Sequence, residues 1–582
     1  MASRIFLVIA LGAVLELSLA SKDLEWWKVG PVYQIYPASF ADSNGDGIGD
    51  IRGIESHIDH FVKLGVAAVW LSPIYTSPML DNGYDVANYT EVNPMFGNMT
   101  DIESLIDALH KRGINILLDM VPNHTSNQSQ WFIDSIHRKN NKDDWYVWKD
   151  PKGKDSNGKP IPPNNWVSRF GGSAWEYNDV RNQFFLHQFE VAQPDLNYDN
   201  PEVMKGMESV VRFWLSKGVD GFRMDAVPFV GESNYDSDEP PIPGCTPAGS
   251  WECYNHIYTQ NQNSTYDVTN HFAAVLNEDN KSFSAAPKVQ FIEAYTDTES
   301  VNRYYQSKST VPFNFLMISN VKRDTNAKSL EQQVQQYLKS LPANAWPNWV
   351  IGNHDNSRIG TRMGPELIDA MNMLLLLMPG TAISYNGEEI GMTDGVVKPS
   401  ERRDPTADSR DPCRTPMQWN TSPNAGFSTN GTSLYLPVNP NFESINVETE
   451  TKIQPSHLSI YEELVKLHKE IIGSPKDISS SVFNDWVFAF KREKYLVIIN
   501  LNNLEETLTL EQLKLDLGKK VQVKIVSLGG SIRQNETEFS THDTITLFPR
   551  TGLVFEAKSA ASTIFASSML VILSMCRALR LF

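Results

Sequence analysis

The feature that most constrains this chain is a repeated alternation of short apolar segments with amphipathic ones. Residues 31–36 (PVYQIY) and 67–71 (AAVWL) have the composition of strands, and the apolar residues of 51–64, between them, recur at helical spacing. Strand and helix alternate in this way about eight times along the chain. The alternation predicts a parallel sheet of the α/β class, and eight repeats predict a (β/α)8 TIM barrel.

The same periodicity places the other barrel elements. A helix from about Ile102 to Leu109 is expected to begin with a capping box formed by Thr100 and Glu103 and to end at Gly113. Further strands are expected at 114–118, 219–224, 289–293, 311–316, 348–352 and 381–385. Further helices are expected at 201–217, 329–340, 365–378 and 457–472.

Two intervals depart from this rhythm. Residues 125–197 are rich in Asn, Asp, Trp, Gly and Pro with little periodicity, which predicts a lid sub-domain (domain B) inserted after the third strand. After about residue 480 the period changes to two, which is typical of an antiparallel β-sandwich domain. We therefore expect the barrel to comprise 21–124 and 198–480, and the C-terminal β domain to comprise 481–557.

Both ends of the chain carry targeting features. In residues 1–20, Arg4 precedes an apolar run that ends in small residues, which predicts a signal peptide cleaved after Ala20. In residues 558–582, small residues lead into an apolar tail too short to span a bilayer, which resembles a GPI-attachment signal. A frayed amphipathic end is the alternative. We expect a secreted protein held on the extracellular face of the cell membrane, in contact with the membrane through its lipid anchor.

The composition excludes some partners and fits an oxidising compartment. The net charge is −18 and no basic tract compensates for it, so nucleic acid is not expected as a partner. Cys245 and Cys253 lie in one loop and could form a disulfide, and Cys576 falls in the tail that anchoring would remove, which would leave Cys413 free. The sequence has no CxxC pair and no cysteine–histidine cluster, so zinc is not expected. Glycosylation sequons, expected in a secreted glycoprotein, occur at Asn88, Asn98, Asn123, Asn127, Asn263, Asn280, Asn420, Asn430 and Asn535.

Polar residues follow four of the expected strands, at the ends where a TIM barrel carries its catalytic groups. The four segments are Asp119–His124, Gly221–Ala226, Phe291–Ala294 and Ile351–Asp355. One acid at such a turn is more simply a helix N-cap, but four in barrel order favour a site. Their carboxylates, with two histidines and an arginine, suit acid/base and nucleophilic chemistry at a glycosidic bond. Arg223, two residues before Asp225, lies on the same side of its strand and can hold that carboxylate ionised.

These segments resemble the signature regions of glycoside hydrolase family 13, the α-amylase family, over about Trp26 to Glu556. Gln193–Asn197 is similar to the marker of its oligo-1,6-glucosidase subfamily, which includes maltases, and the whole chain resembles the maltase-type α-glucosidases of insects. The resemblance implies a retaining α-glucosidase acting through a covalent β-glucosyl-enzyme. Its substrates would be small sugars: maltose, sucrose and short oligosaccharides with terminal non-reducing α-1,4-linked glucose.

The resemblance also implies residue roles. By motif position Asp225 matches the nucleophile, Glu293 the general acid/base and Asp355 the transition-state stabiliser. Arg414 lies close enough to compete with Arg410 for the role of the arginine that pairs with the glucose-binding acid. The residues implied to bind the terminal glucose are Asp81, Tyr84, His124, Phe189, Gln193, Arg223, His354 and Arg410.

One loop after the first strand has the spacing of a calcium site. Oxygen ligands at alternating positions, with Gly47 at the sixth, follow the start of a calcium-binding loop, although Gly53 replaces the final glutamate. A loop that is merely rich in turns is the alternative. Because the resembled subfamily carries a structural ion here, we expect structural calcium. The expected ligands are Asp42, Asn44, Asp46, Ile48 (through its carbonyl) and Asp50.

A non-enzymatic function is the alternative hypothesis. The heavy chains of amino-acid transporters, and surface receptors, are built on the same ectodomain but act by binding. They have a long membrane helix before the barrel and usually lack part of the catalytic set, whereas here the first apolar run is signal-like and all three acids are present. Sucrose isomerases and trehalose synthases would use the same carboxylates, so product analysis must separate them.

Overall fold

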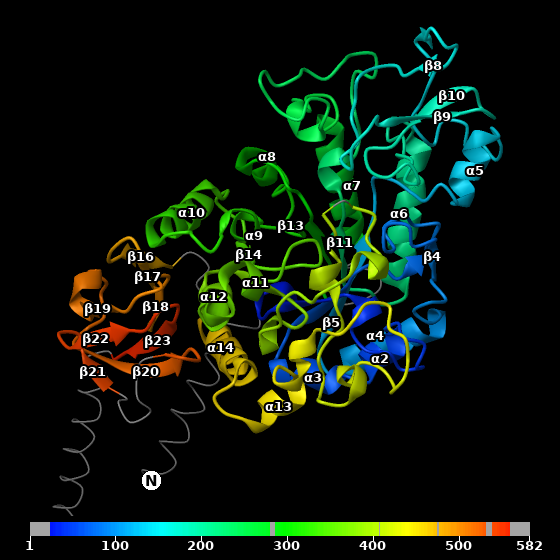
Figure 1. Ribbon diagram of the computed structural model, residues 1–582. Helices are drawn as coiled ribbons and strands as arrows, with labels where there is room; N and C mark the ends of the chain where they lie inside the picture. Colours follow the sequence, from blue (N-terminus) through cyan, green and yellow to red (C-terminus); the bar gives the residue numbers. More distant parts are fainter. Residues whose placement is uncertain (1–23, 280–285, 407, 474–476, 531–537, 559–582) are drawn as a thin grey trace, which may run out of the picture.

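The computed structural model describes residues 24–558, except 280–285, 407, 474–476 and 531–537. The expected signal peptide and all of the expected attachment signal beyond Lys558 lie outside the described residues. Within those residues, no helix combines the length and the apolar composition needed to cross a bilayer. Figure 1 shows a central barrel, with one small domain near β9 and β10 and another formed by the last strands of the chain.

The central element is a parallel eight-stranded sheet, as predicted, and it confirms the barrel. In sheet order its strands are β13 (Thr310–Pro312), β12 (Val289–Ile292), β11 (Gly221–Met224), β5 (Asn115–Met120), β2 (Ala68–Leu71), β1 (Val32–Ile35), β15 (Thr381–Tyr385) and β14 (Asn348–Val350). At the seam between β13 and β14, the Asn348 side chain donates to the Pro312 carbonyl (2.7 Å) and accepts from the Asn314 N–H (2.8 Å). This amide links the two strands where no ladder joins them.

Side-chain alternation explains the buried barrel. In β1, Val32 belongs to the cluster inside the barrel, whereas Tyr33 and Ile35 belong to the core beneath the helices. Both faces of the strands are apolar because helices cover the outside. The main helices of the barrel are α2 (Ile51–Glu55), α3 (Ile58–Leu64), α4 (Met99–Lys111), α6 (Pro201–Ser216), α7 (Asn263–Asp279), α8 (Thr298–Asn302), α9 (Leu316–Asn320), α10 (Ala327–Ser340), α11 (Ile359–Met363), α12 (Ile368–Leu377), α13 (Val447–Lys452) and α14 (His457–Ile471).

Two local predictions were wrong. The helix expected over 51–64 is divided into α2 and α3, with His57 between them outside helical geometry. The capping box of α4 is formed by Asn98 and Asp101 rather than by Thr100 and Glu103. Asn98 is the better N-cap because its amide oxygen accepts from two backbone N–H groups at the helix start.

A small sub-domain lies between β5 and α6. It contains α5 (Gln130–Ile136), a sheet of β6 (Trp148–Lys149), β10 (Gln183–Leu186) and β9 (Trp175–Asn178), and a hairpin of β7 (Gly153–Lys154) and β8 (Pro160–Ile161). Its own core is formed by six buried residues that include Trp166 and Trp175. An isolated bridge joins His124 to Asp195, so the two ends of the segment meet beside the barrel.

The C-terminal domain is antiparallel, as predicted. Its six-stranded sheet has the order β16 (Ser479–Val482), β17 (Val487–Arg492), β18 (Tyr495–Asn500), β23 (Gly552–Ala557), β20 (Lys520–Val526) and β21 (Glu538–Ser540), and β19 (Glu506–Thr509) pairs with β22 (Thr544–Leu547). Val487 and Ile498 face the small sheet, whereas Phe488 and Ile499 join the barrel core. The period of two in the sequence therefore corresponds to a sheet that packs on both of its faces.

Candidate active site

The predicted residues at the strand ends meet around one buried guanidinium. Arg223, at the end of β11, is 1% exposed and donates to Asp119 (2.9 Å) and to Asp225. Its other terminal nitrogen lies 4.0 Å from Glu293. Arg223 therefore contacts carboxylates from three neighbouring strand ends, which is possible because parallel strands deliver their carboxyl ends to one rim.

Backbone and electrostatic contacts distinguish these acids. Glu293 accepts from the Ala226 N–H (2.6 Å), and burial raises its pKa, against the pull of Arg223. Burial likewise raises the pKa of Asp225 to about 7; Arg223 opposes this shift, and Glu293 adds to it. Asp119, Asp225 and Glu293 also lie too close together to be ionised all at once at low cost, which adds to the effect of burial in raising the pKa of each.

Asp355 stays ionised beside them. Burial alone would raise its pKa, but His354, Arg410 and Arg414 together hold it well below its usual range. Arg410 and Arg414 each donate to the same Asp355 oxygen at 3.1 Å. The site therefore contains one carboxylate that is charged at any working pH, beside three carboxyl groups whose raised pKa values favour a bound proton.

The structure distinguishes the roles of the two arginines that the sequence left as alternatives. Arg410 donates to Asp81 (2.8 Å) and also binds Asp404 (2.7 Å). Arg414 lies behind it and donates to the His354 carbonyl (2.7 Å). Arg410 is the partner of Asp81, and the carboxylate that Arg414 contacts is Asp355.

A cavity of about 710 Å³ opens above these groups. Its wall includes Asp225, Glu293 and Asp355, together with Arg410. Of the residues predicted to bind sugar, the wall also includes Asp81, Tyr84, His124 and Phe189. The structure thus brings eight of the predicted site residues together in a single pocket. Seven are carboxylate, aromatic or histidine side chains, and one is an arginine.

Three predicted residues are buried behind the wall instead. Gln193 donates to Asp81 (3.1 Å), and Arg223 holds the acids as described. His354 has both ring nitrogens engaged, by Gln34 and by the Tyr84 hydroxyl, each at 2.6 Å. These residues support the groups that line the cavity rather than lining it themselves.

His124 is different because one of its ring nitrogens is free. Burial lowers its pKa to about 4, so the ring is neutral at working pH. Its Nδ1 lies 3.2 Å from Asn123, whereas its Nε2 has no hydrogen-bond partner within the described part of the chain. Because an unpaired buried nitrogen is costly, this atom is suited to meet a ligand hydroxyl. Asn123 is itself 1% exposed, so its predicted sequon is inaccessible in the folded protein.

The sequence motifs did not assign several residues that line or support the pocket. Asp119 lies in a recognised motif but was not assigned; burial raises its pKa to about 7 although Arg223 opposes the shift. At the mouth, Arg169 pairs with Glu252 (2.8 Å) and lies 4.5 Å from the Trp251 ring centroid. No local pattern connects position 169 with position 251, so only the fold reveals this contact.

The loop that carries Trp251 is closed by the predicted disulfide. Cys245 and Cys253 are bonded, and Cys413 is free and buried, as expected. Trp251 stacks on His256 with ring centroids 4.0 Å apart. The tryptophan is therefore held at the mouth by a cross-linked loop and a stacked ring.

The predicted calcium loop is closed on itself. Asp42 accepts from the backbone N–H groups of Gly45 and Gly47, each at 2.7 Å. Asp50 accepts from Ser43 and caps α2 through Gly53. Among the residues that the structure describes, no group of three or more His, Cys, Asp or Glu side chains is arranged to hold a metal ion. The calcium assignment stays a prediction.

Comparison with known proteins gives a consistent result. The profile of the alpha amylase catalytic domain matches residues 34–473. An alpha-glucosidase of Apis mellifera is 42% identical over 82% of this chain and 86% of its own length. Maltase A1 of Drosophila melanogaster is 37% identical over 89% and 94%, respectively.

Solved structures and one relative of another kind complete the comparison. Trehalulose synthase of Pseudomonas mesoacidophila superposes with a TM-score of 0.79 at 29% identity, covering 92% of this chain and all of that one. An alpha-glucosyl transfer enzyme gives a TM-score of 0.80 at 30% identity with the same coverage. A human amino acid transporter heavy chain is 38% identical over 79% of this chain and 67% of its own length.

Proposed function

The chain belongs to the α-amylase family and is an α-glucosidase, and we propose that it is a retaining maltase with Asp225 as nucleophile and Glu293 as acid/base. The observation that carries this assignment is the contact of one buried arginine with Asp225, while Glu293 lies 4.0 Å away and is held by a backbone N–H. The closer arginine contact favours the anion on Asp225 and opposes the rise in pKa that burial causes there, and motif position assigns the proton to Glu293.

The proposed mechanism starts with Asp225 ionised and Glu293 protonated. Asp225 attacks the anomeric carbon while Glu293 gives its proton to the glycosidic oxygen, so the leaving sugar departs neutral. Glu293, now ionised, takes a proton from water as the water attacks the glucosyl-enzyme and releases Asp225. Asp355 remains a fixed negative charge beside the positive charge that develops on the glucosyl ring. Two inversions at one carbon return the α-anomer.

The pocket supports cutting from the chain end. Asp81 is held by Arg410 and Gln193, and its position in the wall suits binding of the hydroxyls of a terminal glucose. Tyr84 is stacked on His354 and offers a fixed ring face. His124 offers its free nitrogen to a further hydroxyl. We propose α-1,4-linked maltose, sucrose and short oligosaccharides as substrates, in keeping with the oligo-1,6-glucosidase-type marker at Gln193–Asn197.

A binding-only role, as in a transporter heavy chain, is less well supported. Such a protein needs neither a paired Asp225 and Arg223 nor a proton-holding Glu293. Here the acids, the arginine and the cavity are all present together. A binding partner on another surface is compatible with this conclusion.

The test compares two substrates. Asp225→Asn should lose activity on both maltose and an aryl α-glucoside with a good leaving group, by about three orders of magnitude or more. Glu293→Gln should lose maltose hydrolysis but keep a burst of phenol release from the aryl glucoside, because that leaving group needs no proton. Asp59→Asn, whose carboxylate is exposed, is the matched control. Equal losses on both substrates in Glu293→Gln would contradict its assignment.

For location we propose a lipid-anchored protein on the outer cell surface. The support is sequence alone: the apolar start, the small residues and apolar tail of 558–582, and the many sequons. Phosphatidylinositol-specific phospholipase should release active protein from intact cells. A mature protein that keeps Arg580, Leu581 and Phe582 by mass spectrometry would refute the anchor.

A structural calcium ion in the Asp42–Asp50 loop is a further proposal. It is supported by the ligand spacing and by the family, and opposed by the backbone bonds that already occupy Asp42 and Asp50. An ion would supply only local rigidity to the loop, and no step of the reaction passes through it.

A further inference from the structure

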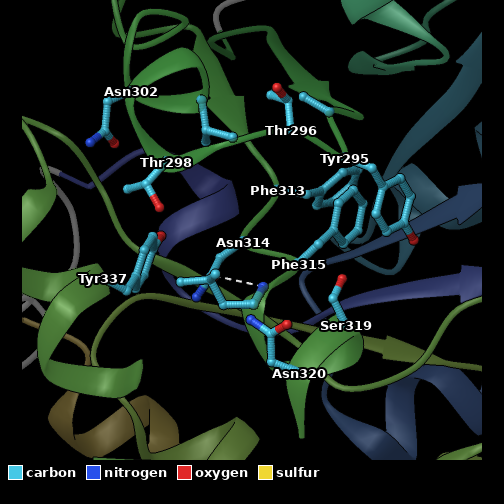
Figure 2. A pocket seen from close by; sticks show the side chains of 13 residues that line it. Tyr295, Thr296, Thr298, Asn302, Phe313, Asn314, Phe315, Ser319, Asn320 and Tyr337 are labelled. Carbon is cyan, nitrogen blue, oxygen red and sulfur yellow. Dashed lines mark hydrogen bonds between the residues drawn. The ribbon is translucent and has the colours of Figure 1, made fainter. Parts of the chain in front are cut away.

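A second cavity lies beside the catalytic pocket. It measures about 330 Å³ and is formed by residues that follow β12 and β13 and by α8, α9 and α10. Figure 2 shows its lining. Tyr295 belongs to the wall of this cavity and to the wall of the catalytic pocket, so the two are neighbours through one side chain.

The lining carries no charge. None of its thirteen residues is Asp, Glu, Lys, Arg or His, although charged residues make up 21% of the chain. A bound ion would leave water without gaining a partner of opposite charge, which is costly. The cavity therefore selects a neutral ligand.

The walls combine ring faces with polar groups. Tyr295 stacks on Phe315 with centroids 4.0 Å apart and nearly parallel planes, and Figure 2 places Tyr337 across from this pair. The rings offer flat apolar surface at opposite sides of the space. Ser319 and Asn320 lie at an exposed edge of the lining.

One polar group in the lining is unpaired. Asn314 is 3% exposed, and its Nδ2 has no hydrogen-bond partner among the residues described. Its oxygen accepts from the Leu316 N–H (3.2 Å), which fixes the orientation of the amide. A buried donor without a partner is costly unless a ligand oxygen meets it.

We propose that this cavity is a second sugar site, which holds one neutral pyranose ring against Tyr295 and Phe315. A pyranose has an apolar C–H face for the rings and hydroxyls for the amides, and no charge. The space is less than half the 710 Å³ of the catalytic pocket and suits a single ring. This second-site proposal rests on the proposed function only in the choice of glucose as the probe.

The experiment titrates glucose into the mature protein with the catalytic pocket filled by saturating 1-deoxynojirimycin. Saturation-transfer NMR reports binding, and crystals soaked in both compounds report its position. Ser319→Trp fills the edge of the second cavity, and Ser329→Trp, at an exposed site on α10 outside the lining, is the matched control. Neither serine belongs to the catalytic machinery.

The blocked wild-type protein and the control should bind glucose saturably, with millimolar affinity. Ser319→Trp should weaken that binding by about tenfold or more while keeping maltose hydrolysis close to wild type. Glucuronate and glucosamine, which carry charge, should not compete. Absence of saturable binding in the blocked protein, equal binding by Ser319→Trp, or competition by the charged sugars would each overturn the proposal. If the proposed function were wrong, the unblocked wild-type protein would not hydrolyse maltose, and that result is independent of glucose binding at the second site.

Discussion

At the scale of single residues, Arg223 organises the site. One guanidinium contacts Asp119, Asp225 and Glu293, and the strand spacing of two already predicted its contact with Asp225. The resemblance matched Arg410 to the partner of Asp81 but left nearby Arg414 in competition, and the structure gives this contact to Arg410. Sequence motifs therefore identify the acids, and the fold identifies which cation serves each one.

Ala226, directly after Asp225, is a second decisive residue. It has a left-handed backbone with φ of 50° and lines the pocket. We expect Ala226→Val to narrow the space for the sugar that leaves, and to shift the maltose to isomaltose ratio of kcat/KM toward isomaltose. The β-branched side chain is also disfavoured at this φ, so the melting temperature should fall.

Ala226→Ser is the control for this prediction, since it adds one polar atom without a branched carbon. The two substrates should be compared with each variant at matched folded concentrations. An unchanged ratio in a folded Ala226→Val protein would show that this position does not set linkage preference.

At the scale of elements, one buried acidic pair joins the sub-domain to the barrel. Gln188 donates to Asp195 (2.8 Å) and to Glu232 (2.7 Å), and Asp195 also bridges to His124. Burial raises the pKa of Asp195 to about 7, although Gln188 opposes the shift. The contact between the sub-domain and the barrel is therefore made through the Gln188 amide to two buried carboxyl groups whose pKa values are raised by burial.

This pair predicts a pH dependence of stability. The folded protein binds the Asp195 proton more tightly than the unfolded chain, so the native state is favoured at low pH and loses this contribution as pH rises from about 4 to about 7. Asp195→Asn keeps an amide oxygen for Gln188 and removes the titration. Its melting temperature relative to wild type should rise between about pH 5 and about pH 8.

Asp236→Asn, at an exposed position in the loop that also carries Glu232, is the control and should show no such trend. Thermal melts across the pH range decide the question. A difference between Asp195→Asn and wild type that is constant with pH would mean that the pair does not titrate in this range.

The loop of the proposed ion gives another prediction at this scale. Removing metal with a chelator should lower the melting temperature of wild type and leave Asp46→Ala, which lacks one proposed ligand, unchanged. Ser43→Ala is a control within the same loop. Unchanged melting in excess chelator, together with no metal by elemental analysis, would eliminate the ion.

The strands of the barrel were easier to predict from sequence than the starts and breaks of its helices. The strands of the barrel were predicted within a few residues because continuous apolar runs mark strands buried on both faces. The helix start at Asn98 was misread because Thr100 and Glu103 also fit a capping box, and only the backbone geometry chooses between them. The break at His57 leaves no signal in the apolar spacing, which continues through it.

At the scale of the whole molecule, the barrel and the sub-domain enclose one catalytic pocket, and the C-terminal sheet packs against the barrel core away from it. The barrel supplies the acids, and the sub-domain supplies Phe189 and Arg169 at the wall. The eightfold rhythm predicted this architecture, whereas the mouth formed by Arg169, Trp251 and the disulfide loop could not be foreseen. Contacts between loops distant in sequence depend on how the domains pack, which local periodicity does not encode.

The most direct test of the account is the configuration of the first glucose released from maltose, followed by proton NMR before mutarotation. A retaining enzyme with Asp225 as nucleophile must release α-glucose, and its two carboxyl groups should lie about 5–5.5 Å apart. We expect an initial α-anomer signal that later decays toward equilibrium. An initial β-anomer signal would mean direct attack by water and would contradict the assignment of Asp225 and Glu293.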